Sequence, residues 1–566
     1  MNGGDLLIKL LQNHGIEYIF CSPGSEWAPV WENLAQRFGN GDDRIKYINC
    51  RDETLAVSTA LGYAKYSKKL SALLFHANVG PLHGAMAIRA ALMFHAPMMI
   101  ISSYTAEYGD YQGNKKWETH WLSHLSDVGG PGALVKPYVK WSNTVTSEKT
   151  LIDSISRGCQ IAQTSPCGPV LVAVPKELMA EVLDVKDLPS AVNVQVESKA
   201  VYNDLTALAR QLVESKQPVI LTEYAGENLG AVDKLVELAE LLSIPVFESV
   251  KPIFANFPRN HPLHQGNNAA QMLDQADTIL VVGATTPWFP VSEYPKNDAK
   301  VIVVDEDQLK LQLPYHGYRS DYSIAGNIEQ SLSQLVNAVR DCKQNTAQPT
   351  SIYAERLDRY KARHDQMAEE ARTEAEAEKS LKPISPKWFQ YLANRMLPGN
   401  AISIVETITH SQSLYTYMTE SKRFYRCSDG GLGCGLGIAI GAKIADSDSP
   451  VIYYVGDGSF NYGPILAGFG LCQEYQLPIM TIILNNRGYA AMRAGHRGLF
   501  PKGWAVTHDS YLGVDITPQP DYVKIAEAFN AYAEKIEDPD SIDPILIKAL
   551  HQLTDGKSVL LNVITR

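Results

Sequence analysis

Two polar segments near the C-terminal end carry residue types that bind a metal ion next to a phosphate. Asp457, with a glycine on each side, follows an apolar run at residues 451–455, and Asn486 follows a second apolar run at 479–484. A helix-like pattern separates the runs, so the sequence predicts a strand–helix–strand unit with polar groups where each strand ends. Ligands of parallel α/β sheets collect outside the carboxyl ends of neighbouring strands, which would bring Asp457 and Asn486 together.

The chemistry of this pair favours Mg²⁺ bound against a diphosphate. A carboxylate, an amide oxygen and a nearby backbone carbonyl form the oxygen-only ligand set that suits Mg²⁺. The glycines beside Asp457 allow the backbone to approach a diphosphate, and the N-terminus of the following helix favours its negative charge. An ordinary strand–helix–strand crossover is the alternative, because both short motifs are also common in tight turns.

Length and composition indicate an ordinary globular protein of several domains. The chain has 566 residues, 45% of them hydrophobic and 20% charged, and its net charge of −11 argues against non-specific nucleic-acid binding. No apolar run is long enough to span a membrane, and the start of the chain lacks a signal-peptide pattern. Eight cysteines without a C-x-x-C pair argue against a zinc site or a disulfide framework, so we expect a reduced, cytoplasmic protein.

Alternating helical and strand patterns predict an α/β fold with three doubly wound parallel-sheet domains. We place these domains at residues 1–185, 200–345 and 383–566, with a polar linker at 183–200. A charged, Ala/Glu-rich stretch at 362–379 is typical of a surface helix leading into the third domain. Predicted strands lie at 18–21, 45–49, 71–75, 97–102, 218–222, 278–283, 301–305, 401–405, 451–455, 479–484 and 558–564.

Two further features accompany the Asp457 and Asn486 motifs. Glu53 begins a predicted helix directly after a predicted strand, and a glycine-rich segment spans 429–435. With these features, and with 26 residues between the Gly-Asp-Gly and Asn-Asn motifs, the chain resembles a known superfamily over nearly its whole length. That superfamily comprises the thiamine diphosphate (ThDP)-dependent 2-oxo acid decarboxylases and acetolactate synthases, including benzoylformate decarboxylase. The resemblance implies pyrimidine-binding, central and diphosphate-binding domains, and a homodimer or homotetramer with sites between subunits.

The resemblance assigns roles to the cofactor-side residues. Glu53 would form a hydrogen bond with N1′ of the aminopyrimidine, where the chemistry needs a proton donor. Taken alone, Glu53 is an everyday carboxylate at a helix start. Leu432 would hold the cofactor in its bent conformation. The other positions implied as cofactor-binding are Gly430, Gly458, Ser459, Asn486, Thr409, His410 and Ser411, and those implied as Mg²⁺ ligands are Asp457, Asn486 and the carbonyl of Gly488.

Residues on the substrate side follow from the same resemblance. Ser25 matches a serine that binds the substrate carboxylate in benzoylformate decarboxylase, and His76 matches an active-site histidine suited to proton transfer. His83 could face the same cavity, although a structural role is commoner for a lone histidine. The region 117–141, rich in histidine and lysine, could shape the substrate entry or merely decorate a loop.

The central domain departs from benzoylformate decarboxylase. Its stretch 283–290 lacks that enzyme's second active-site histidine, and Trp288 with Phe289 could line the pocket or belong to the core. Some acetolactate synthases bind FAD in this domain, but residues 221–225 show no glycine-rich dinucleotide turn, so we do not expect FAD.

The predicted function is therefore a ThDP- and Mg²⁺-dependent carboligase, similar to acetolactate synthase. It would decarboxylate a 2-oxo acid and transfer the acyl carbanion to a carbonyl acceptor, with the thiazolium as electron sink. Two alternatives remain open at this point. One is a simple decarboxylase that releases an aldehyde, and the other is a catalytically silent homologue that serves as a binding subunit.

Overall fold

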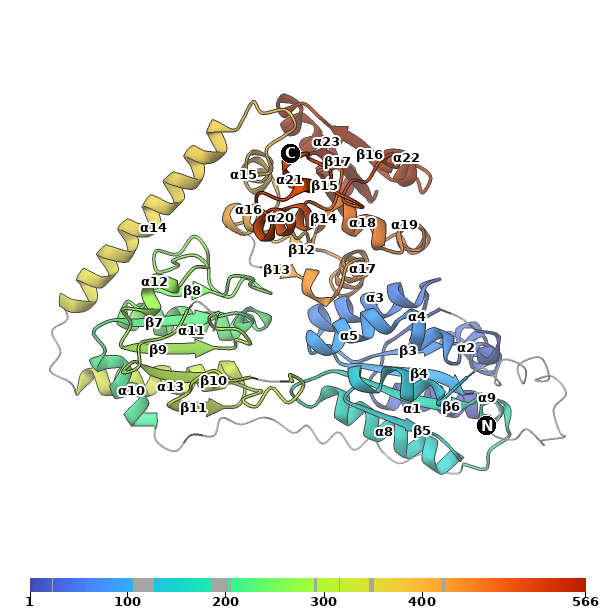
Figure 1. The fold of residues 1–566 in the computed structure, drawn as a ribbon. Helices are drawn as coiled ribbons and strands as arrows, with labels where there is room; N and C mark the ends of the chain where they lie inside the picture. Colours follow the sequence, from blue (N-terminus) through green and yellow to red (C-terminus); the bar gives the residue numbers. More distant parts are fainter. Residues whose placement is uncertain are drawn as a thin grey trace.

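Three parallel β-sheets, each covered by helices on both faces, form three α/β domains that meet at the centre of a triangle (Figure 1). The predicted fold class is thereby confirmed. The structure is a computed structural model, and it describes residues 1–22, 24–104, 127–185, 202, 205–289, 293–314, 316–345, 351–419 and 423–566. Most of the predicted linker at 183–200 lies outside these residues, as does much of the region 117–141, including His120 and His124.

The N-terminal domain has a six-stranded parallel sheet in the order β2-β1-β3-β4-β6-β5. Its strands are β1 (Tyr18–Cys21), β2 (Lys46–Asn49), β3 (Ser71–Phe75), β4 (Met98–Tyr104), β5 (Trp141–Thr144) and β6 (Pro169–Pro175). Its helices are α1 (Gly3–Asn13), η1 (Ser25–Trp27), α2 (Ala28–Gly39), α3 (Glu53–Ser67), α4 (Val79–His83), α5 (Ala85–Met93), α7 (Gly130–Val135), η3 (Lys136–Tyr138), α8 (Glu148–Gln163) and α9 (Lys176–Ala180). Because β2, β1 and β3 are neighbours, the segments that follow them meet at one edge of the sheet.

The central domain has a five-stranded parallel sheet in the order β11-β10-β9-β7-β8. Its strands are β7 (Pro218–Thr222), β8 (Val246–Glu248), β9 (Thr278–Val282), β10 (Lys300–Asp305) and β11 (Tyr322–Ala325). Its helices are α10 (Leu205–Glu214), η4 (Ala225–Glu227), α11 (Leu229–Leu242), α12 (Ala270–Leu273) and α13 (Ile328–Gln344). Helix α14 (Ser351–Ala377) then runs along the outside of the molecule to the third domain (Figure 1), and it begins well before the predicted residue 362.

The C-terminal domain repeats the pattern of the first, with the strand order β13-β12-β14-β15-β17-β16. Its strands are β12 (Ile402–Glu406), β13 (Arg423–Arg426), β14 (Val451–Gly456), β15 (Met480–Asn485), β16 (Tyr532–Ile536) and β17 (Val559–Ile564). Its helices are α15 (Pro386–Met396), α16 (Ser411–Tyr417), η5 (Ser428–Gly430), α17 (Gly435–Ala445), α18 (Asp457–Tyr462), α19 (Ile465–Glu474), α20 (Ala490–Leu499), α21 (Trp504–Thr507), α22 (Tyr522–Glu527), η6 (Pro539–Ser541) and α23 (Ile542–Thr554).

Glycines allow the first and third domains to pack closely through α3 and α17. A Cβ atom added to Gly62 would lie 2.1 Å from the carbonyl oxygen of Ile438, and one added to Gly441 would lie 2.0 Å from that of Thr59. No side chain fits at such distances, so the two helices touch backbone to backbone. Small residues in this part of the sequence therefore fix the relative position of the two domains.

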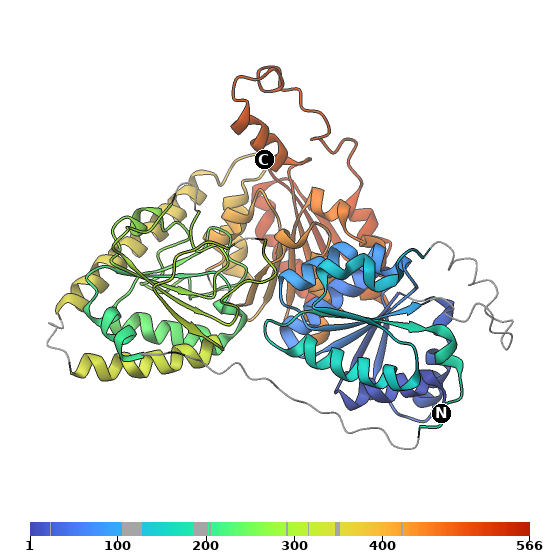
Figure 2. The same ribbon diagram turned by 60° about the horizontal axis from the view of Figure 1, so that its bottom comes forward.

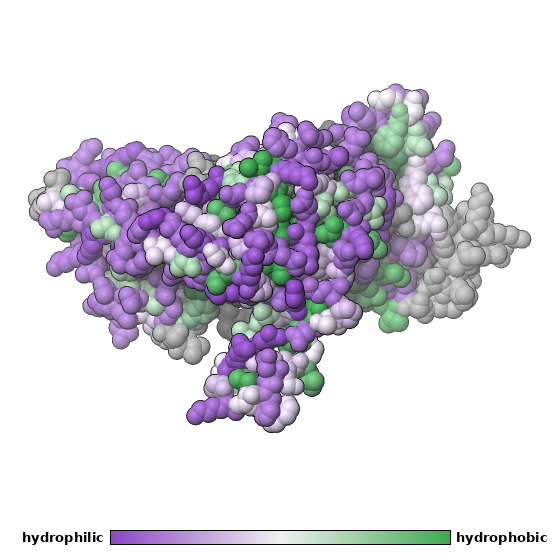
Figure 3. Space-filling model, turned by 90° about the horizontal axis from the view of Figure 1, so that it is seen from above, coloured by the Kyte–Doolittle hydropathy of each residue, from purple (hydrophilic) through white to green (hydrophobic). Residues whose placement is uncertain are grey.

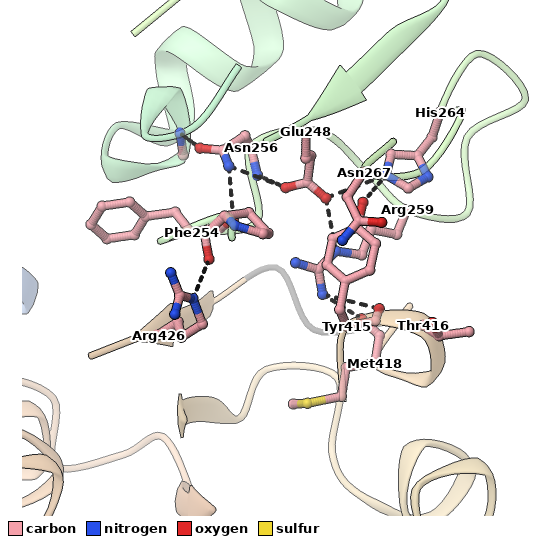
Figure 4. Close-up of polar contacts among 12 residues, drawn as sticks. Glu248, Phe254, Asn256, Arg259, His264, Asn267, Tyr415, Thr416, Met418 and Arg426 are labelled. Carbon is pink, nitrogen blue, oxygen red and sulfur yellow. Dashed lines mark hydrogen bonds and ion pairs between the residues drawn. The ribbon is translucent and has the colours of Figure 1, made fainter. Parts of the chain in front are cut away.

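A buried ionic cluster joins the central domain to α16 of the third domain (Figure 4). Glu248, at the end of β8, accepts a hydrogen bond from Arg259 at 3.0 Å and lies 3.3 Å from Nε2 of His264. Burial opposes ionisation of Glu248, but the Arg259 charge and the hydrogen bond with His264 lower its pKa to about 2. Arg259 also donates to the backbone carbonyls of Tyr415 and Met418, so the C-terminal end of α16 is held by the central domain.

An excursion between β15 and α22 projects from the body of the C-terminal domain (Figure 2). It carries α20 and α21 and exposes large apolar side chains, among them Leu499 at 78%, Trp504 at 69% and Leu512 at 95% exposure. Seen from above, this lobe shows apolar residues among polar ones (Figure 3). None of the helices among the described residues combines the length and the apolar character that crossing a membrane requires.

Candidate active site

The structure brings Asp457 and Asn486 to the same edge of the third sheet. Asp457 is the first residue of α18, directly after β14, and Asn486 directly follows the neighbouring parallel strand β15. Burial of Asp457, which is 1% exposed, raises its pKa to about 6, while the backbone N–H groups of Gly458, Gly488 and Asn486 oppose this shift. The carboxylate therefore lies within hydrogen-bonding reach of the chain that follows β15, as the strand-exit argument predicts.

Asn486 presents a buried oxygen with no protein partner. Its Nδ2 lies 3.4 Å from Nε2 of His410, and burial lowers the pKa of His410 to about 4. The neutral imidazole can accept the amide hydrogen, which directs Oδ1 of Asn486 to the opposite side. That Oδ1 atom is buried and has no hydrogen-bond partner among the described residues. A bound cation would satisfy a buried oxygen that lies beside a carboxylate and has no protein partner.

Backbone cradles surround this edge. A Cβ atom on Gly458 would lie 2.7 Å from the Tyr489 ring, and one on Gly488 would lie 2.6 Å from the carbonyl oxygen of Val514. A Cβ atom on Gly456 would meet nothing within 4 Å, so the chain passes open space immediately before Asp457. The buried Ser459 lies in the first turn of α18. Gly456 therefore leaves room for a group held close to the main chain, whereas Gly458 and Gly488 allow Tyr489 and Val514 to pack against the backbone.

The other residues expected at the diphosphate differ in exposure. His410 is 5% exposed, and its Nε2 also lies 3.4 Å from Oγ1 of Thr565. Thr409 is exposed, and the Ser411 hydroxyl donates to the carbonyl of Ile408. His410 therefore contacts the side chain of Asn486, while Thr409 has a hydroxyl that is accessible to a ligand.

A carboxylate that the sequence argument missed anchors the glycine-rich segment. Glu406, the last residue of β12, accepts hydrogen bonds from the backbone N–H groups of Gly433 at 2.6 Å, Cys434 at 3.1 Å and Gly435 at 3.2 Å. The Tyr453 hydroxyl also donates to it. Burial raises the pKa of Glu406 to about 7 although these donors oppose the shift. The half-buried Leu432 directly precedes the anchored residues, so Glu406 fixes the segment that carries it.

The same segment is held from the N-terminal domain. Arg89 donates to the backbone carbonyl of Gly430 at 3.1 Å, and a Cβ atom on Gly430 would lie 2.7 Å from Phe94. Gly431 and Gly433 adopt φ of 121° and 95°, which side-chain-bearing residues rarely reach. The segment predicted to cover the thiazolium thus lies where the first and third domains meet.

At the carboxyl edge of the first sheet, His76 forms a pair with a buried carboxylate. Its Nδ1 lies 2.6 Å from Oε1 of Glu26, which also accepts a hydrogen bond from Ser103 at 2.6 Å. The hydrogen bond with Glu26 raises the pKa of His76, while burial opposes that shift. Glu26 was absent from the sequence argument, although it follows the predicted Ser25 directly. Ser25 itself begins η1 with an exposed side chain.

Glu53 and His83 form a second pair at this edge. Glu53 begins α3, capped by Asp52, and its Oε2 lies 2.6 Å from Nδ1 of His83. The Glu53 side chain is 13% exposed and that of His83 is 55% exposed. The two histidines singled out in the sequence therefore each meet a glutamate.

The central-domain aromatic pair is divided between core and surface. Trp288 is 4% exposed and stacks edge-on against Tyr318, so the core-packing alternative describes it, whereas Phe289 is 42% exposed. His316, from later in the chain, places Nε2 at 3.1 Å from the carbonyl of Thr285. The stretch 283–290 itself contains no histidine, but His316, from a later part of the central domain, contacts it.

Comparison with known proteins gives consistent matches along the chain. Profiles of the thiamine pyrophosphate enzyme match in three parts, the N-terminal TPP binding domain over residues 1–126, the central domain over 205–335 and the C-terminal TPP binding domain over 407–563. Benzoylformate decarboxylase of Pseudomonas aeruginosa is 26% identical over 99% of this chain and 98% of its own length. The acetolactate synthase large subunit of Buchnera aphidicola is 22% identical over 100% and 94%.

Other relatives and solved structures extend the range. Sulfoacetaldehyde acetyltransferase of Roseovarius nubinhibens is 25% identical over 99% of this chain and 92% of its own length. The structure of a ThDP-dependent 4-hydroxybenzoylformate decarboxylase from Rhodococcus jostii superposes with a TM-score of 0.79 at 23% identity, covering 100% of this chain and 99% of that one. This structural likeness shows a shared three-domain fold.

Proposed function

Because the chain belongs to the superfamily of ThDP-dependent 2-oxo acid decarboxylases and acetolactate synthases, we propose that it is a Mg²⁺- and ThDP-dependent carboligase. Its reaction is decarboxylation of a 2-oxo acid followed by transfer of the acyl group to a carbonyl acceptor. The observation that supports the cofactor most directly is the buried Oδ1 of Asn486 beside Asp457, which has no partner among the residues that the structure describes.

Residues of the third domain fit Mg²⁺ and a diphosphate. Asp457 supplies a carboxylate, Asn486 an amide oxygen and Gly488 a backbone carbonyl, which together form an oxygen-only ligand set. Among the described residues, no three His, Cys, Asp or Glu side chains gather into an alternative metal-binding group. Asp457, whose burial raises its pKa to about 6, gains a favourable partner when a cation binds. Ser459 and Thr409 provide hydroxyl groups for the diphosphate oxygens.

Residues of the first domain, together with Leu432 of the third, fit the reacting end of the cofactor. Glu53 would hold and exchange a proton with the aminopyrimidine, and Leu432, fixed through Glu406, would contact the cofactor. When bound, the thiazolium supplies the electron sink that accepts the charge left by loss of CO₂. Ser25 binds the substrate carboxylate, and His76, oriented by Glu26, moves protons near the reacting carbon.

Two features support an assembly in which each site lies between two copies of the chain. The excursion with α20 and α21 exposes Leu499, Trp504 and Leu512, which a second subunit would cover. The catalytic edge of the first sheet also exposes Val79 at 57% and Leu82 at 56%, close in sequence to His83. We therefore propose a homodimer or homotetramer.

The test is a substrate screen with product analysis. The protein is incubated with pyruvate or benzoylformate, with and without an acceptor aldehyde, and the products are identified by mass spectrometry. Acyloin formation supports the carboligase, and aldehyde as the sole product would refute it. A protein that releases no CO₂ from any 2-oxo acid, although it binds ThDP, would be a silent homologue. The intact Glu53, Asp457 and Asn486 argue against that outcome.

Simple decarboxylation is the second candidate function, and two contacts favour it. The hydrogen bond with Glu26 raises the pKa of His76, so a proton is available near neutral pH. His316 adds a central-domain histidine beside Thr285. If these histidines protonate the reacting carbon, replacing His316 with asparagine lowers the ratio of aldehyde to acyloin, and an unchanged ratio removes His316 from this role.

A further inference from the structure

His83 bridges the Glu53 carboxylate and the protein surface. Its Nδ1 is 2.6 Å from Oε2 of Glu53, at a hydrogen-bonding distance, while more than half of its side chain is exposed. Glu53, by contrast, is 13% exposed. The imidazole therefore has one nitrogen on the carboxylate, while the exposed part of its side chain is in contact with solvent.

Contacts on both sides hold this imidazole in place. Asp52 places Oδ2 at 3.7 Å from Nε2 of His83, while its Oδ1 accepts the backbone hydrogen of Leu55 at the start of α3. Thr54 donates its hydroxyl hydrogen to the backbone carbonyl of His83 at 3.0 Å. The end of α4 is thus tied to the start of α3, and the charged groups that face His83 are Asp52 and Glu53.

The proposed chemistry gives Glu53 a need for such a bridge. Each catalytic cycle requires the carboxyl to exchange a proton at N1′, and a carboxyl with little exposure has few waters with which to re-equilibrate. An imidazole carries protons well near neutral pH because one nitrogen can accept a proton while the other gives one. His83 is the titratable group placed between Glu53 and solvent.

We propose that His83 is the proton carrier between solvent and Glu53, an inference that rests on the proposed role of Glu53 at the cofactor. In the uptake direction, Nε2 takes a proton from water, Nδ1 gives its proton to Oε2 of Glu53, and Oε1 gives a proton to N1′. In the release direction, each transfer reverses, so one proton passes between water and N1′ and nothing is oxidised or reduced. The hydrogen bond with Glu53 raises the pKa of His83, which keeps the imidazole able to hold this proton.

The test measures the exchange of the C2 hydrogen of bound ThDP for deuterium, by rapid acid quench and proton NMR, without any substrate. We expect His83→Asn to slow this exchange by at least about tenfold, less than the roughly 100- to 10,000-fold effect of a direct general acid–base group because His83 acts through Glu53. Added imidazole should restore part of the rate in His83→Ala, because a free base can replace the missing carrier. Calorimetric ThDP affinity should remain within about twofold of the wild type, since a proton carrier need not bind the cofactor.

His261→Asn is the matched control. His261 also pairs with a glutamate, with Nε2 3.2 Å from Oε1 of Glu240, but it lies on the central domain far from the proposed site in sequence and fold. This variant should exchange the C2 hydrogen at the wild-type rate. It thereby shows whether slower exchange is specific to the loss of His83 or follows from the loss of any His–Glu pair.

The outcomes distinguish this inference from the proposed function. Glu53→Gln that exchanges at the wild-type rate overturns the role of Glu53 and the inference with it. If Glu53→Gln blocks exchange and His83→Asn does not slow it, the function stands and the carrier is refuted. A loss of ThDP affinity in His83→Asn as large as its loss of exchange rate, without imidazole rescue, shows a positioning role and also overturns the proposal.

Discussion

The carboxyl edges of the third and central sheets have the same parallel architecture but differ in whether their buried carboxylate and amide groups are paired. At the third sheet, Asp457 is buried without a cationic side chain, and Oδ1 of Asn486 has no partner among the described residues. At the central sheet, Lys310 forms an ion pair with Asp305 at 2.9 Å and contacts the hydroxyl of Tyr224. The Asn486 oxygen is thus unpaired at one edge, whereas at the other edge the Asp305 carboxylate is paired and the hydroxyls of Thr222 and Ser249 are buried without a partner among the described residues.

Glu223 at the central edge is likewise paired with groups of the protein itself. Its Oε2 accepts the backbone hydrogens of Thr285 at 2.7 Å and Thr286 at 3.0 Å. A phosphate bound at the end of β9 would compete with this carboxylate for the same donors. The difference teaches that parallel-sheet topology supplies a possible site, whereas unsatisfied ligand atoms indicate that the site is used.

Removing the charge of Asp457 should have the largest functional effect. In Asp457→Asn we expect apparent ThDP affinity in the presence of Mg²⁺ to fall by more than about 100-fold, because the metal loses its anionic ligand. The cofactor-free protein should keep its thermal stability, since the variant removes a buried charge. Thermal unfolding with and without ThDP and Mg²⁺ measures both quantities.

Chelation provides the control for this prediction. EDTA should remove the ThDP-induced rise in the melting temperature of the wild type, a stabilisation of about 2.7 kcal/mol at 100 times Kd, and should change little in Asp457→Asn. A full ThDP-induced rise in Asp457→Asn would contradict the assignment of the metal to this edge.

At the central edge we expect a substitution to lower stability and to leave ThDP affinity unchanged. Lys310→Met leaves the Asp305 carboxylate buried without its cation, and we expect it to lower the free energy of unfolding by about 3–5 kcal/mol. Lys310 and Asp305 are 5% and 2% exposed. ThDP affinity of the folded variant should stay at the wild-type value. Urea unfolding measures the loss of stability, and calorimetry measures the ThDP affinity. Weakened ThDP binding at unchanged stability would contradict the proposed difference between the two edges.

Glu406 predicts a pH dependence of stability at the third sheet. Burial raises its pKa in the folded protein from 4.5 to about 7, so the folded state binds the proton more tightly than the unfolded state. Protonated Glu406 is favourable below pH 4.5, and this contribution is lost as the pH rises towards 7. Relative to Glu406→Gln, the wild type should therefore lose roughly 3 kcal/mol of unfolding free energy across this range.

Denaturant unfolding of both proteins at closely spaced pH values measures this difference. Glu534, an acidic residue whose hydrogen bonds with Lys548 and Tyr532 lower its pKa although burial opposes the shift, gives a control through Glu534→Gln. In that variant the sign reverses, since the wild type gains its contribution as the pH rises. Parallel pH curves for the wild type and Glu406→Gln would show that Glu406 titrates normally.

The sequence predicted those parts of the fold that depend on local pattern. Runs of buried apolar residues marked β1, β3 and β7 at their observed bounds, because a strand buried on both faces is apolar throughout. Strands β5, β6, β8, β11, β13 and β16 were missed. All of them except β6 lie at sheet edges, where polar residues such as Arg423 and Lys535 are tolerated, whereas β6 is an interior strand that is buried throughout. The start of α14 was placed too late for a similar reason, since its apolar pattern is weak.

The candidate site divides in the same way. Asp457, Asn486, Glu53 and His76 stand where strands end, so strand positions alone could suggest them. Glu406 also follows a predicted strand, but its contacts, like those of Gln519 and His316, are with residues far away in the sequence, and no local pattern indicates such contacts. The direction of the Asn486 amide likewise depends on His410, 76 positions away.

Gln519 should produce the smallest effect at the third edge. Its Nε2 donates to Asp457 Oδ2 at 3.3 Å and to Asn485 Oδ1 at 2.9 Å, so it orients the carboxylate without being a predicted ligand. Residues that orient metal ligands typically contribute 10- to 100-fold to metal affinity, and we expect Gln519→Leu to weaken Mg²⁺ binding by about tenfold. Titration of Mg²⁺ at saturating ThDP measures this change.

Gln308, which donates to backbone carbonyls of Asp305 and Ile324 at the central edge, is the matched control, and Gln308→Leu should leave the titration unchanged. Equal effects of the two variants would show that Gln519 stabilises the fold and does not orient Asp457.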